Sequence, residues 1–209
     1  RMGLGVVAAI LINNVAGKHS DSALAAISVV TRIMMLPTAA MLGFGQGFQP
    51  VAGFSWGAKR YDRVRESYRF SSIIGVSFIA AVSLLIGIFA KQILLLFTEN
   101  NTDLVEIGSL CLISQCISMP LNAWVIVVNM LYSALGKPTG AIILGITRQG
   151  LCFIPVIYIL PSLFGINGVA VSQAVADLFS FLLTVPFAVI ILRDIAKREK
   201  NEIQLPRIE

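Results

Sequence analysis

The most regular feature of this sequence is the alternation of long apolar runs with short polar breaks. Three of the runs contain no charged residue at all: Ile73–Phe89, Cys111–Leu135 and Gly150–Val175. An apolar run of about 20 residues has the length that a helix needs to cross the hydrocarbon core of a bilayer. The pattern therefore predicts an all-α, polytopic membrane helix bundle of about six transmembrane helices.

Polar breaks set the limits of the expected helices. The breaks carry charged residues, Gly and Pro, which end helices and favour turns. The expected spans are Met2–Ala16, Ser22–Phe54, Phe70–Phe97, Val105–Leu135, Thr139–Leu160 and Gly168–Leu192. We expect residues 1–192 to form one transmembrane lobe and residues 193–209 to form a charged cytoplasmic tail.

Composition supports a membrane protein. The chain is 56% hydrophobic and only 13% charged, whereas soluble domains average about 25% charged residues. Most of the 16 Lys and Arg residues fall in the second break (residues 56–69), in the fourth break (residues 136–138) and after the last span. Because positive loops stay in the cytoplasm, we expect both termini to be cytoplasmic. The membrane is expected to be the plasma membrane. The net charge of +5 does not indicate nucleic-acid binding, since the basic residues lie between spans rather than on a soluble face.

Three ionisable residues fall deep inside the expected spans: Arg32, Arg148 and Asp177. Charges at membrane depth are costly, and they are usually paired or functional. Two interpretations of Asp177 remain open. It forms a structural ion pair with Arg32 or Arg148, or it is a carboxylate coupled to a proton or another cation.

Neutral amides in the spans are further candidates for a substrate or ion pathway. Gln46 and Gln49 lie three residues apart, on one helix face, within the glycine-rich stretch Gly43–Gly53. Small residues four apart, such as Gly43 and Gly47, allow helices to approach closely. The glutamines either form hydrogen bonds between helices or line a polar path. The remaining candidates are Asn13, Asn14, Asn122, Asn129 and Gln173, and the spans contain two further amides, Gln115 and Gln149.

Motifs of enzymes and metal sites are missing from the sequence. It contains no zinc-protease, nucleophile-elbow or phosphate-loop motif, and its three cysteines lie inside apolar segments without ligand spacing. We therefore expect no enzymatic activity, no metal site and no cofactor.

Several motifs together resemble one family of transporters. The stretch Ala25–Arg60 contains Arg32-Ile33-Met34, Pro37, Gly43–Pro50 and Gly57-Ala58-Lys59, and it resembles the second helix of a lobe in multidrug and toxic compound extrusion (MATE) transporters. Further resemblance comes from three motifs in chain order: Leu135–Pro138, Thr147–Gly150 with Pro155, and Gly165–Ala170 leading to Asp177. The resemblance covers essentially the whole chain and points to the C-terminal six-helix lobe of a twelve-helix protein.

The resemblance implies a secondary transporter. Such a protein exports small organic cations by antiport with protons or sodium, between two lobes related by a pseudo-twofold. Its partners are then membrane lipid and either the missing N-terminal lobe or a second copy of the chain. Some members carry carboxylates in the first and fourth helices of this lobe, but this chain has no Asp or Glu in Met2–Ala16 or Leu110–Leu135.

Two alternatives to a drug and cation antiporter remain. One is a related flippase of lipid-linked oligosaccharides, which would need several cationic residues around its cavity to hold a pyrophosphate. The other is a membrane assembly subunit that transports nothing.

Overall fold

A computed structural model describes residues 8, 10–14, 17, 21–97 and 102–203 of the 209-residue chain. Among these residues the regular secondary structure is helical, and short turns join the helices. The helices are α2 (Asp21–Gly57), α3 (Tyr61–Ile88), α4 (Ala90–Leu95), α5 (Thr102–Ala134), α6 (Pro138–Ile146), the π-helix η1 (Thr147–Cys152) and α7 (Phe153–Ile203). The expectation of an all-α membrane bundle is confirmed. The expected first span, Met2–Ala16, lies largely outside the described residues.

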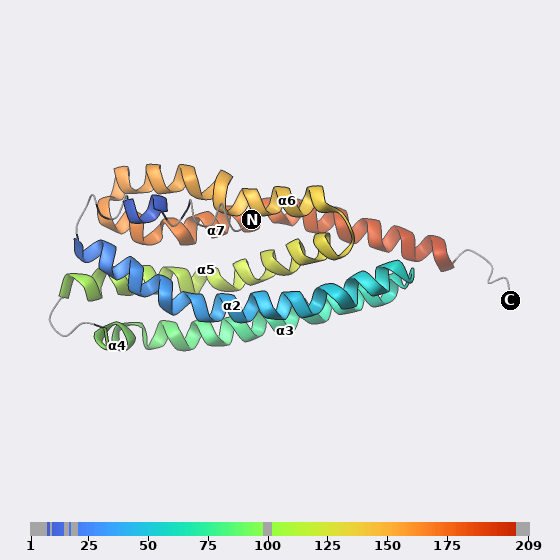
Figure 1. Ribbon diagram of the computed structural model, residues 1–209, viewed down its shortest axis with the longest axis horizontal. Helices are drawn as coiled ribbons and strands as arrows, with labels where there is room; N and C mark the ends of the chain where they lie inside the picture. Colours follow the sequence, from blue (N-terminus) through green and yellow to red (C-terminus); the bar gives the residue numbers. More distant parts are fainter. Residues whose placement is uncertain (1–7, 9, 15–16, 18–20, 98–101, 204–209) are drawn as a thin grey trace.

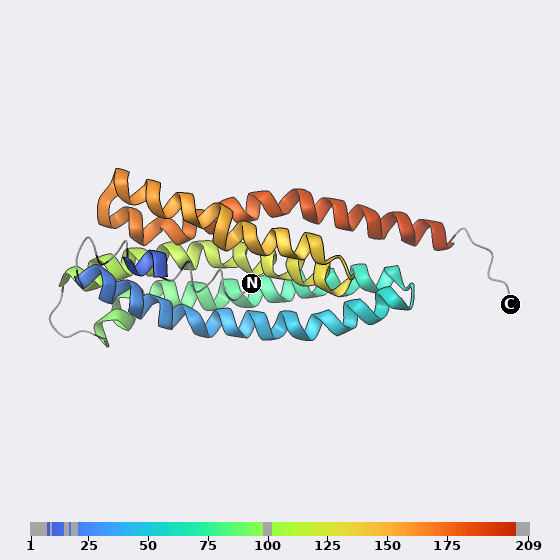
Figure 2. The same cartoon turned by 45° about the horizontal axis from the view of Figure 1, so that its top comes forward.

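The helices lie along one long axis, as Figure 1 shows. Helix α5 is the central element and packs against α2, α3, α6 and α7. Figure 2 shows α2 and α3 running beside each other on one side of α5 and the α6–α7 layer on the other. Centrality explains the composition of α5: residues 125–132 of this helix are all buried, and a helix that is apolar on every side belongs in a core.

Helix α7 contains a sharp corner. At Gly165 the backbone takes φ 58° and ψ −134°, a conformation that residues other than glycine rarely adopt. The chain reverses there, so the apolar stretch Pro138–Glu202 supplies two crossings rather than one. The expected fifth and sixth spans correspond to the two arms of this hairpin.

Three predicted boundaries were wrong. Helix α3 begins at Tyr61 rather than Phe70, so Arg63, Arg65 and Arg69 lie on a helix and not in a loop. The expected third span ends earlier, at Ile88, and α4 follows it as a separate short helix. Helix α7 continues past Leu192 to Ile203. Charged residues mark where helices leave the hydrocarbon, and they do not mark where the helices end.

One end of the bundle gathers the basic residues. The α2–α3 turn, the α5–α6 turn and the last turns of α7 all lie there (Figure 1), and we call it the basic end. This grouping agrees with the charge asymmetry of the sequence, because the second break, the fourth break and the tail share one end.

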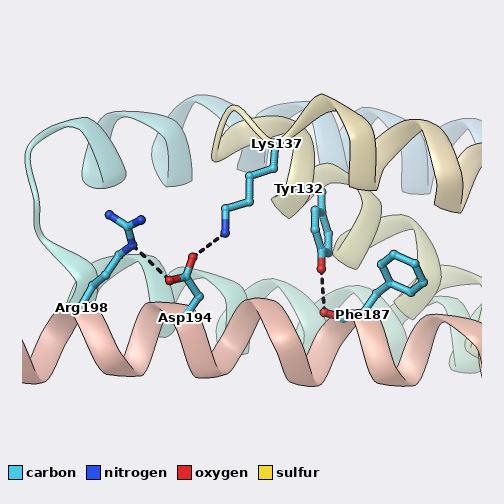
Figure 3. A network of polar contacts seen from close by, with 5 residues as sticks. All are labelled: Tyr132, Lys137, Phe187, Asp194 and Arg198. Carbon is cyan, nitrogen blue, oxygen red and sulfur yellow. Dashed lines mark hydrogen bonds and ion pairs between the residues drawn. The ribbon is translucent and has the colours of Figure 1, made fainter.

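The basic end is fastened by a polar clasp, shown in part in Figure 3. Asp194 of α7 accepts hydrogen bonds from Lys137 and from Arg198, the latter with an Nε–Oδ1 distance of 3.2 Å. Arg198 lies over the Trp56 ring, 5.0 Å from its centroid, and Arg65 on α3 pairs with Glu199 at 3.2 Å. The clasp therefore ties the α2–α3 and α5–α6 turns to α7.

The charged partners of Asp194 also change the pKa of its carboxyl group. Asp194 lies beyond the apolar part of α7. The hydrogen bond from Lys137, together with Arg198, holds the pKa of the Asp194 carboxyl below its ordinary value. The Asp194 carboxylate thus stays ionised, and the clasp closed, throughout the neutral pH range.

Candidate functional site

The candidate site is a cavity of about 420 Å³ in the half of the bundle away from the clasp. Its walls come from the start of the chain (Ala8 and Ile12), from α2, from α5 and from both arms of α7. Its polar lining residues are Thr31, Thr38, Gln115, Asn122, Gln173 and Asp177. Segments that are far apart in the sequence therefore meet around one hollow, within the membrane-spanning part of the chain.

Asp177 is the charged group of this cavity. It lies on the second arm of α7 and is only 5% exposed. The Cys152 thiol lies close to it and to Ser180. A buried carboxylate inside a membrane protein is stable only with a proton, a cation or hydrogen-bond donors beside it.

Asn122 faces the same cavity from α5. Its side chain is 6% exposed, and its Oδ1 atom accepts no hydrogen bond from any described residue. A buried polar atom without a partner is uncommon in native proteins, and it calls for an explanation such as a bound ion. Asn122 Oδ1 is therefore a buried acceptor beside the cavity that has no partner among the described residues.

The hydroxyl groups of the cavity use their donors locally. Thr31 Oγ1 donates to the Ile27 carbonyl at 2.7 Å, and Thr38 Oγ1 donates to the Met34 carbonyl at 2.7 Å. The Gln115 amide donates to Cys111 Sγ at 3.5 Å. The lone pairs of these side-chain oxygens remain as acceptors, while the Gln115, Asn122 and Gln173 amides carry N–H donors as well. The carboxylate and the acceptors around it suit a cation.

A second hollow lies nearer the basic end, between α5 and α6. It measures about 700 Å³ and is lined by small and apolar residues together with Asn129 and Ser133. Asn129 Nδ2 donates to the Ala141 carbonyl at 2.8 Å, and Ser133 donates to the Asn129 carbonyl at 3.1 Å. No ionisable residue is among its described lining, so this hollow, although larger, is not the candidate site.

The glycine-rich stretch Gly43–Gly53 of α2 has one face packed on α5 and one exposed face. Gly53 packs closely on α5, because a Cβ there would lie 3.2 Å from the Ala134 carbonyl oxygen. Gly43 and Gly47 have no heavy atom within 4 Å of a Cβ position, and Gln46 between them is exposed. Close packing within the lobe therefore explains Gly53, and also Gly45, whose Cβ would lie 3.1 Å from Met130 Cγ, but not Gly43 and Gly47.

Comparison with known proteins agrees with this architecture. The profile of the MatE family matches residues 4–159, which is well over half of the chain. The chain belongs to the MatE family. It is a multi-pass membrane protein, and the resemblance inferred from its sequence motifs is confirmed.

Individual relatives of this MatE protein show the same relationship. It is 26% identical over 197 residues to the multidrug export protein MepA of Staphylococcus aureus (strain MSSA476), covering 93% of this chain and 42% of the relative. It superposes with a TM-score of 0.84 on the outward-facing conformation of a multidrug resistance MATE family transporter, at 19% identity over 92% of this chain and 44% of that one. The Vibrio cholerae MATE transporter VcmN in its bent form gives 0.84 at 20% identity, over 93% and 44% of the two chains. This chain thus spans less than half the length of its relatives.

Of the candidates predicted from the sequence of this MatE protein, the structure brings three into the cavity. These are Asp177, Asn122 and Gln173. The other candidates lie elsewhere: Arg32, Gln46, Asn13 and Asn14 are exposed, Gln49 is half-buried, and Asn129 is in the second hollow. The side chain of Arg148 lies outside the description; its backbone belongs to the π-helix.

Sequence reasoning missed Thr31 and Thr38 as lining residues, whereas Gln115 was among the amides noted in the apolar spans. Thr31 and Thr38 are seven residues apart, so two helical turns place them on one face of α2. That spacing was visible in the sequence. Single hydroxyl groups in a membrane helix are nevertheless common, since they satisfy themselves on the preceding turn as both do here.

Proposed function

We propose that this chain is one lobe of a secondary multidrug efflux transporter, which exports small organic cations in exchange for protons or sodium ions. The observation that carries the proposal is the buried Asp177 carboxylate in a cavity whose other polar lining residues are uncharged hydroxyls and amides. The cavity volume of about 420 Å³ falls within the range of small-molecule sites, roughly 300 to 1,000 Å³. The proposal is also supported by the relative MepA, which is named a multidrug export protein.

In this proposal the coupling ion and the organic cation compete for Asp177. A cation that binds one conformation better than the other shifts the balance between inward- and outward-facing states. Asn122 Oδ1, which has no partner among described residues, would help to replace the water around the entering ion. The coupling ion is the only cofactor-like requirement that we propose.

The flippase alternative is less well supported. A pyrophosphate-linked lipid needs cationic side chains around its headgroup. No Lys or Arg is among the described residues that line the cavity, and Arg32 is exposed.

A second lobe would complete the transporter. Helix α2 exposes Leu36 (79%) and Phe54 (80%) along with the open Gly43 and Gly47 positions. Such a face fits a partner lobe, either an N-terminal half or a second copy. The intact mass of the native polypeptide separates the two: about twice the 22.5 kDa of this chain indicates one long protein, and about the same mass indicates a pair of copies. We place the assembly in the cytoplasmic membrane with the basic end inside.

The test is transport by the complete native protein in liposomes. A fluorescent organic cation is loaded, and pH and sodium gradients are imposed separately. We expect export under at least one gradient, and we expect Asp177→Asn to lower the rate about tenfold or more, because the ion-binding charge is removed. Asp103→Asn is the matched control, since Asp103 is exposed in the first turn of α5. Export by Asp177→Asn at the wild-type rate across all pH values would rule the proposal out.

A further inference from the structure

A separate surface feature lies on α3, at the point where this helix enters the membrane from the basic end. Here a shallow hollow of about 470 Å³ is lined by Asp62, Arg65, Glu66, Arg69, Phe70 and Ile73. The packed face of α3 carries other residues, among them Val64, Tyr68 and Ser71. Phe70 and Ile73 are 60% and 62% exposed, and the helix carries no charged residue after Arg69. The hollow therefore lies where lipid headgroups meet acyl chains.

The chemistry of this hollow changes in a fixed order along the helix. Asp62, Glu66, Arg69 and Ile73 are spaced three or four residues apart and so form one stripe. At 1.5 Å per residue, Arg69 lies about 4.5 Å deeper than Glu66, and Ile73 about 6 Å deeper again. From the membrane outward, the stripe is apolar, then cationic, then anionic.

Arg69 is the guanidinium that is available in this stripe. Its neighbour Arg65 is engaged by Glu199 at 3.2 Å, which draws it toward α7. Arg69 is exposed, one turn above the apolar Ile73. A guanidinium in this position presents the planar donor pair that binds a phosphate group in a bidentate manner.

We propose that this stripe binds the headgroup of phosphatidylethanolamine from the surrounding bilayer. Arg69 binds the phosphate, Glu66 and Asp62 bind the ammonium group, and Phe70 and Ile73 lie along the acyl chains. The order of charges along α3 matches the order of groups in this lipid. Phosphatidylglycerol has no ammonium for the carboxylates, and phosphatidylcholine has no N–H to donate to them.

The test is lipid binding by the complete native protein, measured by native mass spectrometry as each lipid is titrated in. We expect wild-type protein to retain phosphatidylethanolamine in preference to phosphatidylglycerol and phosphatidylcholine. Arg69→Gln should weaken phosphatidylethanolamine binding roughly tenfold, because the charge-assisted contact to phosphate is lost. Arg69→Lys, which keeps the charge but not the bidentate geometry, should fall between the two.

The carboxylates give the discriminating variant. Asp62→Asn with Glu66→Gln should abolish the preference for phosphatidylethanolamine while leaving phosphatidylglycerol binding at least as strong as in the wild type. Arg63→Gln is the matched control, since Arg63 is exposed on the same helix and does not line the hollow. The proposal is overturned if the wild type retains the three lipids equally, or if Arg69→Gln binds phosphatidylethanolamine as strongly as the wild type. It is also overturned if a protein, rather than lipid, is found bound to this face. None of these readouts depends on transport.

Discussion

Two asparagines on α5 show how one residue type takes two roles within a single helix. Asn129 Nδ2 donates to the Ala141 carbonyl at 2.8 Å and so holds α6 against α5. Asn122 has a buried Oδ1 that accepts no hydrogen bond from a described residue, and it faces the cavity beside Asp177. The first arrangement stabilises the fold, and the second costs stability at a position suited to a ligand.

The same substitution should therefore have opposite effects at these two positions. Asn129→Leu should lower the free energy of unfolding by about 1 to 3 kcal/mol, because the Ala141 carbonyl is left without its donor. Asn122→Leu should leave stability unchanged or higher, and it should impair cation-driven transport. Thermal unfolding in detergent, followed for both variants, measures the first effect. Equal destabilisation by the two substitutions would contradict the assignment.

The corner of α7 depends on a single small residue as well as on the turn itself. A Cβ at Gly168 would lie 2.3 Å from the Leu160 carbonyl oxygen, which is backbone and cannot move aside cheaply. We expect Gly168→Ala to destabilise the protein by about 1 to 3 kcal/mol through overpacking. The control is Gly87→Ala on α3, where the nearest atom would be Cys116 Cβ at an ordinary 3.7 Å. The two melting temperatures in detergent should differ clearly, and similar values would mean that the corner relaxes.

Helices and their contacts were predicted from the sequence to different degrees. The apolar runs gave the spans around α2 and α5 within a few residues, because hydropathy reports burial in lipid or protein. They gave neither the start of α3 at Tyr61 nor the extension of α7 to Ile203, since a helix in water carries charges freely. The cavity was predicted only in part: Asp177 is unusual in an apolar span, whereas Thr38 has no feature that sets it apart from other hydroxyl residues. Side-chain direction, which excludes Gln46 and Arg32 from the cavity, requires the packed structure.

The clasp that joins α7 to the two turns should respond to pH in a defined way. The pKa of Asp194 is held below its ordinary value, first by Lys137. The stabilisation is therefore complete above the unfolded pKa of about 3.9 and is lost as the pH falls through the lower folded value. Because the pair is partly exposed, Asp194→Asn should cost only about 1 kcal/mol at pH 7.

Melting curves of wild type and Asp194→Asn from pH 7 to pH 3 measure this contribution. The difference between the two proteins should shrink as the solution becomes acidic. Glu202→Gln, at an exposed position near the end of the same helix, should melt like the wild type throughout. A difference that grows on acidification would mean that Asp194 is not the ionised partner.

The positions of the clasp and the cavity suggest how the whole lobe moves. At the basic end, charged pairs join α3 and the α5–α6 turn to α7, and the Arg198–Trp56 contact joins α2 to α7. The cavity lies in the other half, where α7 reverses at Gly165. Interfaces fixed at one end favour motion of the lobe as a rigid body, with local rearrangement confined to the cavity half. A lobe that rocks in this way never needs to open its clasp.

Cross-linking tests this view directly. With the native cysteines replaced, Lys137→Cys and Asp194→Cys are joined by a bifunctional thiol reagent, and efflux is measured before and after the reaction. We expect efflux to be unchanged, because the reagent joins two positions that already stay in contact. Joining Thr38→Cys to Gln173→Cys, which both line the cavity, should stop efflux, because those walls separate to admit a ligand. Loss of efflux on cross-linking the clasp would show instead that the basic end opens during transport, and the rigid-body description of the lobe would then fail.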